Sequence, residues 1–217
     1  MIGSPQINRC IRRIISPALK ENGFSKVETR KAWGWHGHVI WVLKIKAIGN
    51  YLSQVIGMPP MSAFVEIGVF YDFIPFGVYA PSKIEKGFVP EIEDCHIRSE
   101  LLCTLDQSTL KKVLFNPANR KRKDIWWIEK DGSNVEEVVN NIKDAFLKQG
   151  VSWFKKFNDL RLALREIEKE RDCYNKFYRA VYFAKQLRNK PKLNKYKRLF
   201  NEESDKLSKE TFTQYGT

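Results

Sequence analysis

A chain of 217 residues with 43% hydrophobic residues and six tryptophans is long and apolar enough for a packed core, so its composition argues against intrinsic disorder. It has no run of about 18 apolar residues, and its basic N-terminus lacks the apolar stretch of a signal peptide, so we expect neither a membrane span nor a secretory leader. The four cysteines are scattered without a Cys-x-x-Cys pair, which favours a reduced, cytoplasmic protein over a disulfide scaffold or a zinc ribbon.

The net charge of +13 is concentrated toward the C-terminus. Residues 1–150 carry 21 Lys and Arg against 16 Asp and Glu, whereas residues 151–217 carry 17 against nine. From Cys173 to Asn201 there are nine bases and no acid. A field of one sign attracts polyanions or acidic partners, and the alternative is a solvated face that only keeps the protein soluble.

The first predicted element is a helix over residues 5–22. Its isoleucines recur at helical spacing, Ser4 is suited to the N-cap, and Gly23 is suited to follow the last turn. After Phe24 the pattern changes to the two-residue period of strands.

Strands dominate the middle of the chain. A turn at His36 and Gly37 joins the first two into a hairpin, residues 50–60 predict a loop, and residues 75–91 predict an irregular connection. Strands are predicted over 27–35, 38–48, 62–74, 92–105 and 124–130.

Helices dominate from Ser133 onward. The first has an apolar stripe from Val135 to Phe146 and is predicted to end at Gly150, before a short aromatic turn over 151–157. One or two amphipathic helices follow between Leu160 and Tyr182, and a last helix is predicted after Pro191, reaching toward residue 210. This order predicts an α+β fold, with an N-terminal helix, a mainly antiparallel sheet and a helical C-terminal extension.

We expect two parts, an α+β domain over residues 1–157 and a basic helical extension over 158–217. In the extension Tyr174, Phe177, Tyr178 and Tyr182 recur on one helical face. The helix can therefore pack by that face while it presents Lys and Arg on the other.

Cys95, His96 and Arg98 form the most concentrated group of reactive side chains. Alternation along a strand places Cys95 on one face, buried, and His96, Arg98 and Glu100 on the other, which argues against a Cys–His dyad. We interpret His96 and Arg98 as a partner- or anion-binding row. The alternatives are a structural hydrogen-bonded network, and an enzyme site built from His96, Arg98 and Glu100.

A metal site is the other chemistry considered. His36 and His38 have the spacing that places two imidazoles on one strand face, and His96 could join them through the fold, but Gly37 makes a hairpin turn the simpler interpretation. We expect no metal and no cofactor. The chain also lacks a phosphate-binding glycine loop, a nucleophile elbow and a zinc-protease motif, so we expect no catalytic residues.

Basic residues supply most of the candidate contacts with an anionic partner. They lie in a polar loop and in the acid-free helical stretch. With the strand row, the full set is His96, Arg98, Arg120, Lys121, Arg122, Lys123, Arg179, Lys185, Arg188, Lys190, Lys192, Lys195, Lys197 and Arg198.

Three groups of residues carry a resemblance to a known family: Leu19, Gly23 and Phe24; Cys95, His96 and Arg98 in a Cys-His-x-Arg strand motif; and Trp153 with Phe154. Over about residues 14–165 the chain resembles the bacterial domain-of-unknown-function family numbered 4304. Where that family often has a second arginine after the motif, this chain has Ser99 and Glu100. The resemblance implies a bacterial origin and an α+β domain, and its members look like accessory proteins found near defence and toxin–immunity genes.

These observations predict a non-enzymatic, cytoplasmic binding or accessory protein of a bacterial defence or toxin-immunity system. It would dock an acidic partner protein or nucleic acid through its basic C-terminal helices, without contact with a membrane. The alternative is nucleic-acid binding as the main function, through the Arg120–Lys123 loop and the helices over 176–198.

Overall fold

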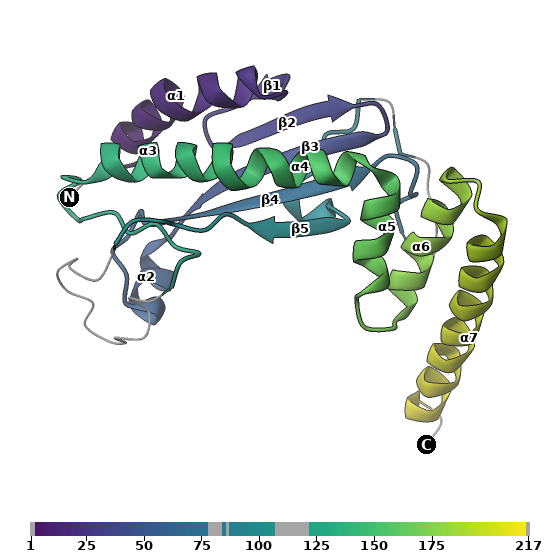
Figure 1. The fold of residues 1–217 in the computed structure, drawn as a ribbon. Coiled ribbons are helices and arrows are strands. Elements are labelled where there is room, and N and C mark those ends of the chain that lie inside the picture. Colours follow the sequence, from purple (N-terminus) through teal and green to yellow (C-terminus); the bar gives the residue numbers. More distant parts are fainter. Residues whose placement is uncertain (1–2, 78–83, 86, 107–121, 216–217) are drawn as a thin grey trace. The chain divides into compact units, whose positions relative to one another are not determined.

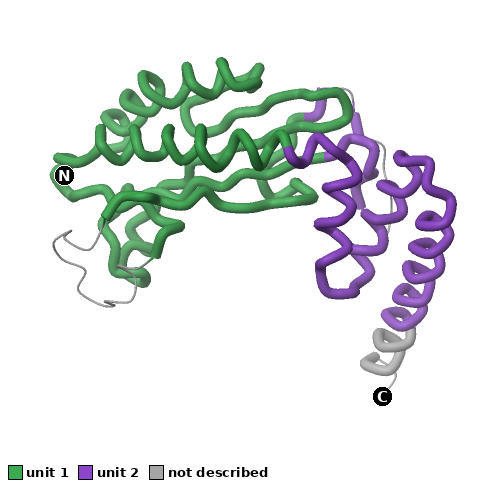
Figure 2. Tube along the Cα trace, in the orientation of Figure 1, with its two compact units in different colours: residues 1–70, 89–155 green, residues 71–88, 156–217 purple. Residues whose placement is uncertain are grey.

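The computed structural model describes residues 3–77, 84–85, 87–106 and 122–215, and side chains up to residue 208. The chain divides into two compact units (Figure 2). Unit 1 comprises residues 1–70 and 89–155, and unit 2 comprises residues 71–88 and 156–217.

Unit 1 is built on a five-stranded antiparallel sheet, so the predicted α+β fold is confirmed. The strands follow one another in the sheet in chain order, which is the arrangement that short antiparallel connections produce. They are β1 (Lys26–Val27), β2 (Lys31–His36), β3 (Val39–Ala47), β4 (Ala63–Tyr71) and β5 (Ile97–Glu100).

Two helices, α1 (Ser4–Glu21) and α3 (Val135–Ala145), lie side by side against the sheet (Figure 1). Each places an apolar stripe inward, with Ile11 and Ile15 buried from α1 and Val138 and Ile142 from α3. The α1 N-cap is Gly3 rather than the predicted Ser4, which instead occupies the first turn.

An aromatic cluster fills the core of unit 1. The rings of Trp41 and Phe154 are stacked with centroids 5.0 Å apart, and Phe24 meets Phe154 edge-on at 5.4 Å. Burying side chains of this size stabilises a fold by about 1.5–3 kcal/mol each, so the cluster anchors the helices to the sheet.

The helix predicted to end at Gly150 continues through it. One π turn, η3 (Phe146–Gly150), leads directly into α4 (Val151–Asn158), where a short aromatic turn was predicted. Glycine is needed here for space, because a Cβ at Gly150 would lie 3.0 Å from the Phe146 ring. The glycine at this position is therefore explained by close packing and does not mark a helix end.

Three further predictions are wrong. The predicted loop at residues 50–60 contains α2 (Asn50–Ile56), and the predicted strand over 92–105 is a 3-10 turn, η1 (Ile92–Asp94), followed by the short β5. Over 124–130 only Trp126 pairs with a strand, at Ala63. The neighbouring backbone groups form hydrogen bonds with side chains and not with a strand. The Ser62 hydroxyl accepts from Ile128 N–H at 3.1 Å, and Asn134 Nδ2 donates to Trp127 O at 2.9 Å.

Unit 2 contains α5 (Leu160–Glu168), α6 (Tyr174–Gln186) and α7 (Lys190–Tyr215). Helix α6 packs against both others (Figure 1). Lys176 of α6 is buried, and its ammonium donates to Glu170 O at 2.6 Å and to Asp172 Oδ1 at 2.8 Å. In the described part of the chain, no helix has both the length and the apolar character that crossing a bilayer requires.

Candidate anion-binding site

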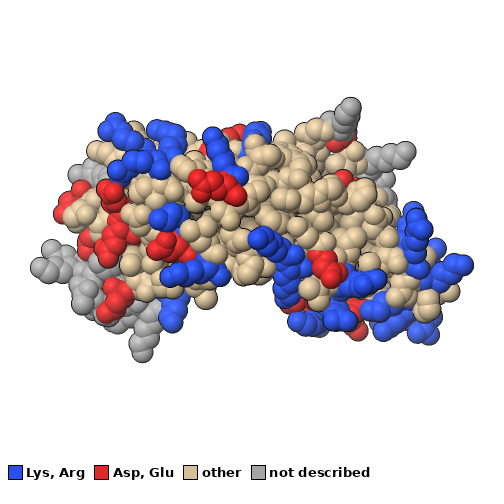
Figure 3. Space-filling model, turned by 45° about the horizontal axis from the view of Figure 1, so that its top comes forward, with Lys and Arg blue, Asp and Glu red and all other residues tan. Residues whose placement is uncertain are grey.

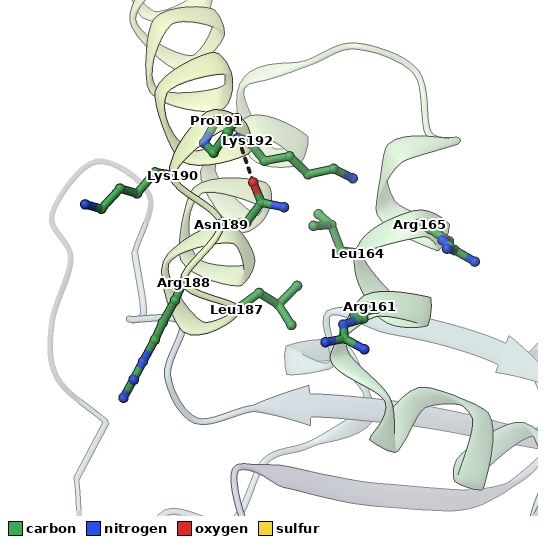
Figure 4. A pocket seen from close by; sticks show the side chains of 9 residues that line it. All are labelled: Arg161, Leu164, Arg165, Leu187, Arg188, Asn189, Lys190, Pro191 and Lys192. Atoms are coloured by element: carbon green, nitrogen blue, oxygen red, sulfur yellow. Dashed lines mark hydrogen bonds between the residues drawn. The ribbon is translucent and has the colours of Figure 1, made fainter.

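The candidate site is a pocket of about 650 Å³ within unit 2, formed by α5, the turn after α6 and the first turn of α7. Its apolar lining includes Leu164 from α5 and Leu187 from the turn after α6 (Figure 4). The remaining lining residues are Arg161, Arg165, Arg188, Asn189, Lys190, Pro191 and Lys192. No acidic side chain lines the pocket.

Local sequence explains the position of these elements. Asp159 caps α5, since its Oδ1 accepts from Arg161 N–H at 2.8 Å. Asn189 opens α7, with its Oδ1 accepting from Lys192 N–H at 3.1 Å (Figure 4). Pro191 stands in the first turn of α7, where the absence of an N–H costs nothing, so it starts this helix.

Four cations of this pocket have no ion pair with a carboxylate in the described part of the chain. Arg161, Arg165, Arg188 and Lys190 are exposed, and none forms an ion pair with any acid among the described residues. These four residues are called the basic pocket below. The positive end of the α7 dipole adds to the same field. Guanidinium groups bind carboxylates and phosphates through paired donors, so this arrangement can hold an anion.

Lys192 has a different role although it also lines the pocket. Its ammonium lies 2.6 Å from Glu168 Oε1, and the Tyr196 hydroxyl donates to the same oxygen. Burial raises the pKa of Glu168, but the two hydrogen bonds and the charge of Lys192 outweigh it and hold that pKa below its ordinary value. The group therefore joins α7 to α5.

The predicted basic stretch separates into paired and unpaired members. Arg179 is paired with Glu170, and Arg198 lies 3.7 Å from Glu202. The remaining predicted residues of this stretch lie outside the pocket: Lys185 is exposed on α6, Lys195 has its ammonium 5.6 Å from the centroid of the Tyr196 ring, and Lys197 is exposed on α7.

Sequence reasoning missed Arg161 and Arg165. They precede the acid-free stretch and stand among glutamates, which made the segment read as neutral. The structure shows that Glu166 is taken by Lys156 and Lys169, and Glu168 by Lys192. Arg161 and Arg165 are four residues apart, which places both on one helix face, and this spacing is the signal that the sequence offered.

The predicted faces of the Cys95 segment are only partly correct. Cys95 is buried, and burial raises the pKa of its thiol, so it is unsuited to act as a nucleophile. However, it precedes β5, and a Cβ at Gly68 would lie 2.7 Å from its Sγ. Gly68 is the cross-strand partner of Arg98, so Cys95 covers the same sheet face that Arg98 occupies. Strand alternation failed because the chain is still turning at Cys95.

The predicted row of His96 and Arg98 does not form one site. The His96 ring packs on Phe70, with centroids 4.8 Å apart. Arg98 and Glu100 are exposed and line a separate pocket of about 460 Å³ with Glu66, which His96 does not line. Of the three residues in the enzyme alternative, Arg98 and Glu100 share a pocket and His96 lies outside it.

The predicted basic loop lies partly outside the described residues, because Arg120 and Lys121 are not among them. Arg122 is paired with Asp124, and Lys123 is exposed. Within the described ranges no three His, Cys, Asp or Glu side chains gather as metal ligands would. His36 lies in β2 with its ring 3.8 Å from that of Trp41, and His38 lies in the turn.

Fold and pocket define an α+β protein that carries a cationic helical unit. Comparison with known families shows that residues 61–156 match the domain of unknown function DUF4304, so the predicted resemblance is confirmed over this range. The match begins after Leu19, Gly23 and Phe24 and ends within α4, so α5, α6 and α7 lie outside it. No curated protein and no solved structure matches the chain.

Proposed function

We propose that the protein is a non-enzymatic nucleic-acid-binding protein that holds the phosphate backbone on the basic pocket of unit 2. The observation that carries this proposal is that Arg161, Arg165, Arg188 and Lys190 all line one pocket and have no acidic partner among the described residues. Neutralising phosphates releases condensed counterions, which is the main source of sequence-independent affinity for nucleic acid.

The composition of the surface favours nucleic acid over an acidic protein. Protein interfaces have an apolar core, whereas nucleic-acid interfaces are dominated by positive charge. Among the described residues of unit 2, Leu207, at 37%, is the one large hydrophobic side chain with substantial exposure. In Figure 3, Lys and Arg side chains gather over the C-terminal helices with few acids between them.

The proposal places the protein in the bacterial cytoplasm. Its four cysteines are free, and Cys173 is exposed, which suits a reducing compartment. Binding without catalysis also fits an accessory role in a defence or toxin-immunity system, which stays a prediction from the family resemblance.

The test is a charge reversal of the whole basic pocket, with Arg161→Glu, Arg165→Glu, Arg188→Glu and Lys190→Glu combined. A matched control reverses four exposed bases of unit 1 that have no ion pair with a described acid: Arg9, Lys20, Lys130 and Lys148. Both variants change the net charge equally. Binding of labelled DNA and RNA is measured by fluorescence anisotropy at fixed salt, and far-UV circular dichroism checks the fold.

We expect the pocket reversal to weaken binding by about a hundredfold or more and the control to weaken it only severalfold, since repulsion acts mainly where phosphates lie close. Equal binding by the two variants would overturn the proposal. If the wild type binds no nucleic acid and instead captures a host protein in nuclease-treated lysate, which the pocket reversal then loses, the partner is an acidic protein.

A further inference from the structure

A second pocket of unit 2, of about 450 Å³, lies between α6 and α7 and is lined mainly by aromatic rings. Tyr174, Tyr178 and Tyr182 come from α6 and Phe200 from α7. Residues four apart lie on one helix face with a rise of about 6 Å between them, so the three tyrosines form a row. These four aromatic residues, with Lys197 and Asn201, are called the tyrosine groove.

The rings of this groove are only partly used in packing. Tyr174 stacks on Phe200 with centroids 4.4 Å apart, and Tyr178 meets Tyr182 at 5.0 Å. Tyr178 is buried and its hydroxyl donates to Pro75 O at 3.1 Å, so it is a structural member. Tyr174, Tyr182 and Phe200 are half-buried and leave part of each ring accessible.

The groove also carries polar groups that its own packing does not use. Lys197 is exposed and forms no ion pair with a described acid, and the exposed Asn201 amide forms no hydrogen bond within the described residues. The groove and the basic pocket share no lining residue, so each can be changed without altering the other.

We propose that the tyrosine groove stacks the bases of single-stranded nucleic acid, with Lys197 against a phosphate and Asn201 at a base edge. The proposal rests on the proposed function and names its substrate class. Bases in a duplex are stacked on one another and cannot reach a side-chain ring, whereas an unpaired strand offers every base to an aromatic platform. Accessible rings beside an unpaired cation match that ligand.

The first test compares ring removal with ring retention. Tyr174→Ala and Tyr182→Ala are each expected to weaken binding of a single-stranded oligonucleotide by about tenfold to a hundredfold, the usual effect of losing one stacked base. Tyr174→Phe and Tyr182→Phe keep the ring and are expected to bind like the wild type. Duplex DNA of the same length is measured in parallel, and its affinity should change little in any of the four variants.

A second test does not depend on a variant that folds. An oligonucleotide containing 5-iodouridine is crosslinked to the wild-type protein with near-ultraviolet light, and mass spectrometry locates the crosslinks, which we expect at Tyr174 or Tyr182. Lys197→Glu is compared with Lys185→Glu, since both lysines are exposed and have no ion pair with a described acid, but only Lys197 lines the groove. Only Lys197→Glu should reduce the ratio of single-strand to duplex affinity.

The outcomes separate this inference from the proposed function. A wild type that binds neither strand form, or a pocket reversal that binds as well as its control, overturns both. A wild type that binds through the basic pocket, while the alanine variants keep full single-strand affinity and crosslinks map outside the groove, overturns the groove alone.

Discussion

The lysines on the sheet of unit 1 and the basic pocket of unit 2 differ in their pairing with acids. In unit 1, Lys31, Lys44 and Lys46 each lie close to carboxylates, with contacts of 2.6 Å to Glu91, 3.0 Å to Glu93 and 3.2 Å to Glu66. In unit 2, the four members of the basic pocket have no such contact with a described acid. The number of bases in a segment therefore does not identify a binding surface. The bases of the basic pocket stand out because they lack such contacts with a described acid and also line one pocket.

Electrostatics within unit 1 agrees with this view. Hydrogen bonds from Lys31 to Glu91 and from Lys44 to Glu93 hold the pKa of each carboxyl below its ordinary value. Burial lowers the pKa of Lys44, but its contacts with Glu93 and Glu91 outweigh this and raise it. These lysines and glutamates therefore stabilise one another's charges.

The largest expected contrast between the units is in salt dependence. Replacing the four basic-pocket residues with Ala should reduce the magnitude of the slope of log affinity against log salt on duplex DNA by up to about 3.6, because each phosphate contact contributes about 0.9. Replacing Lys31, Lys44 and Lys46 with Ala should leave the slope unchanged. Titrations at several salt concentrations measure both, and equal losses of slope would remove the distinction between the units.

Stability should show the reverse contrast. The side chain of Lys44 is only 18% exposed and its ammonium contacts both Glu91 and Glu93, so Lys44→Ala removes the cation that these two carboxylates share and should cost about 1–2 kcal/mol. Arg165→Ala removes an exposed cation and should change stability by less than about 0.5 kcal/mol. Urea unfolding followed by circular dichroism provides the comparison. A larger loss for Arg165→Ala would show that the basic pocket has a structural role.

Within unit 2, Lys192 is the pocket cation that contacts Glu168, and the pH dependence of stability tests this contact. Because the pKa of Glu168 is lowered in the folded state, its contribution to stability is present above the unfolded pKa and is lost as pH falls through the folded pKa. Glu168→Gln should therefore cost about 1 kcal/mol at pH 7. The difference from the wild type should shrink below a pH of about 4.5. A difference that stays constant with pH would exclude the ionised carboxylate as its cause.

The smallest effect concerns His36 in unit 1. Burial lowers its pKa from the ordinary 6.5, and the influence of the nearby Gly23 backbone only partly restores it. The unfolded chain then binds more protons below pH 6.5, so stability should fall as pH drops from neutrality toward 5. The thermal midpoint of His36→Gln should be less sensitive in this range. An identical pH dependence of the two proteins would assign it to other groups.

Strong periodicity made much of the fold predictable, and tertiary contacts explain what was missed. Helix α1 and strand β4 were recognised because their apolar residues repeat at 3.6 and two residues. Gly150 led to a wrong prediction of a helix end, because glycine disfavours a helix locally. In the structure the glycine lies inside the helix, where the nearby Phe146 ring leaves little space for a Cβ. Trp126 and Trp127 have strand propensity. However, the backbone groups of Trp127 and Ile128 form hydrogen bonds with the side chains of Asn134 and Ser62, where a strand would have bonded to its neighbour.

The candidate site was half predictable for a similar reason. The sequence shows which bases exist, and so Arg188 and Lys190 were found. It does not show which glutamate each base meets, because these pairs join different helices, as Lys192 and Glu168 do. The spacing of Arg161 and Arg165 places both on one helix face, but only the structure shows that the neighbouring glutamates are paired with other bases.

Arg188 gives the turn between α6 and α7 a further meaning. Its backbone has φ of 52°, in the left-handed region that costs a residue with a side chain about 1 kcal/mol or more. Arg188→Gly would relieve this strain and raise the melting temperature while it removes a cation from the basic pocket. A screen that selects only for heat resistance would therefore discard the residue, and optimising this protein for robustness and for recognition would lead to different sequences.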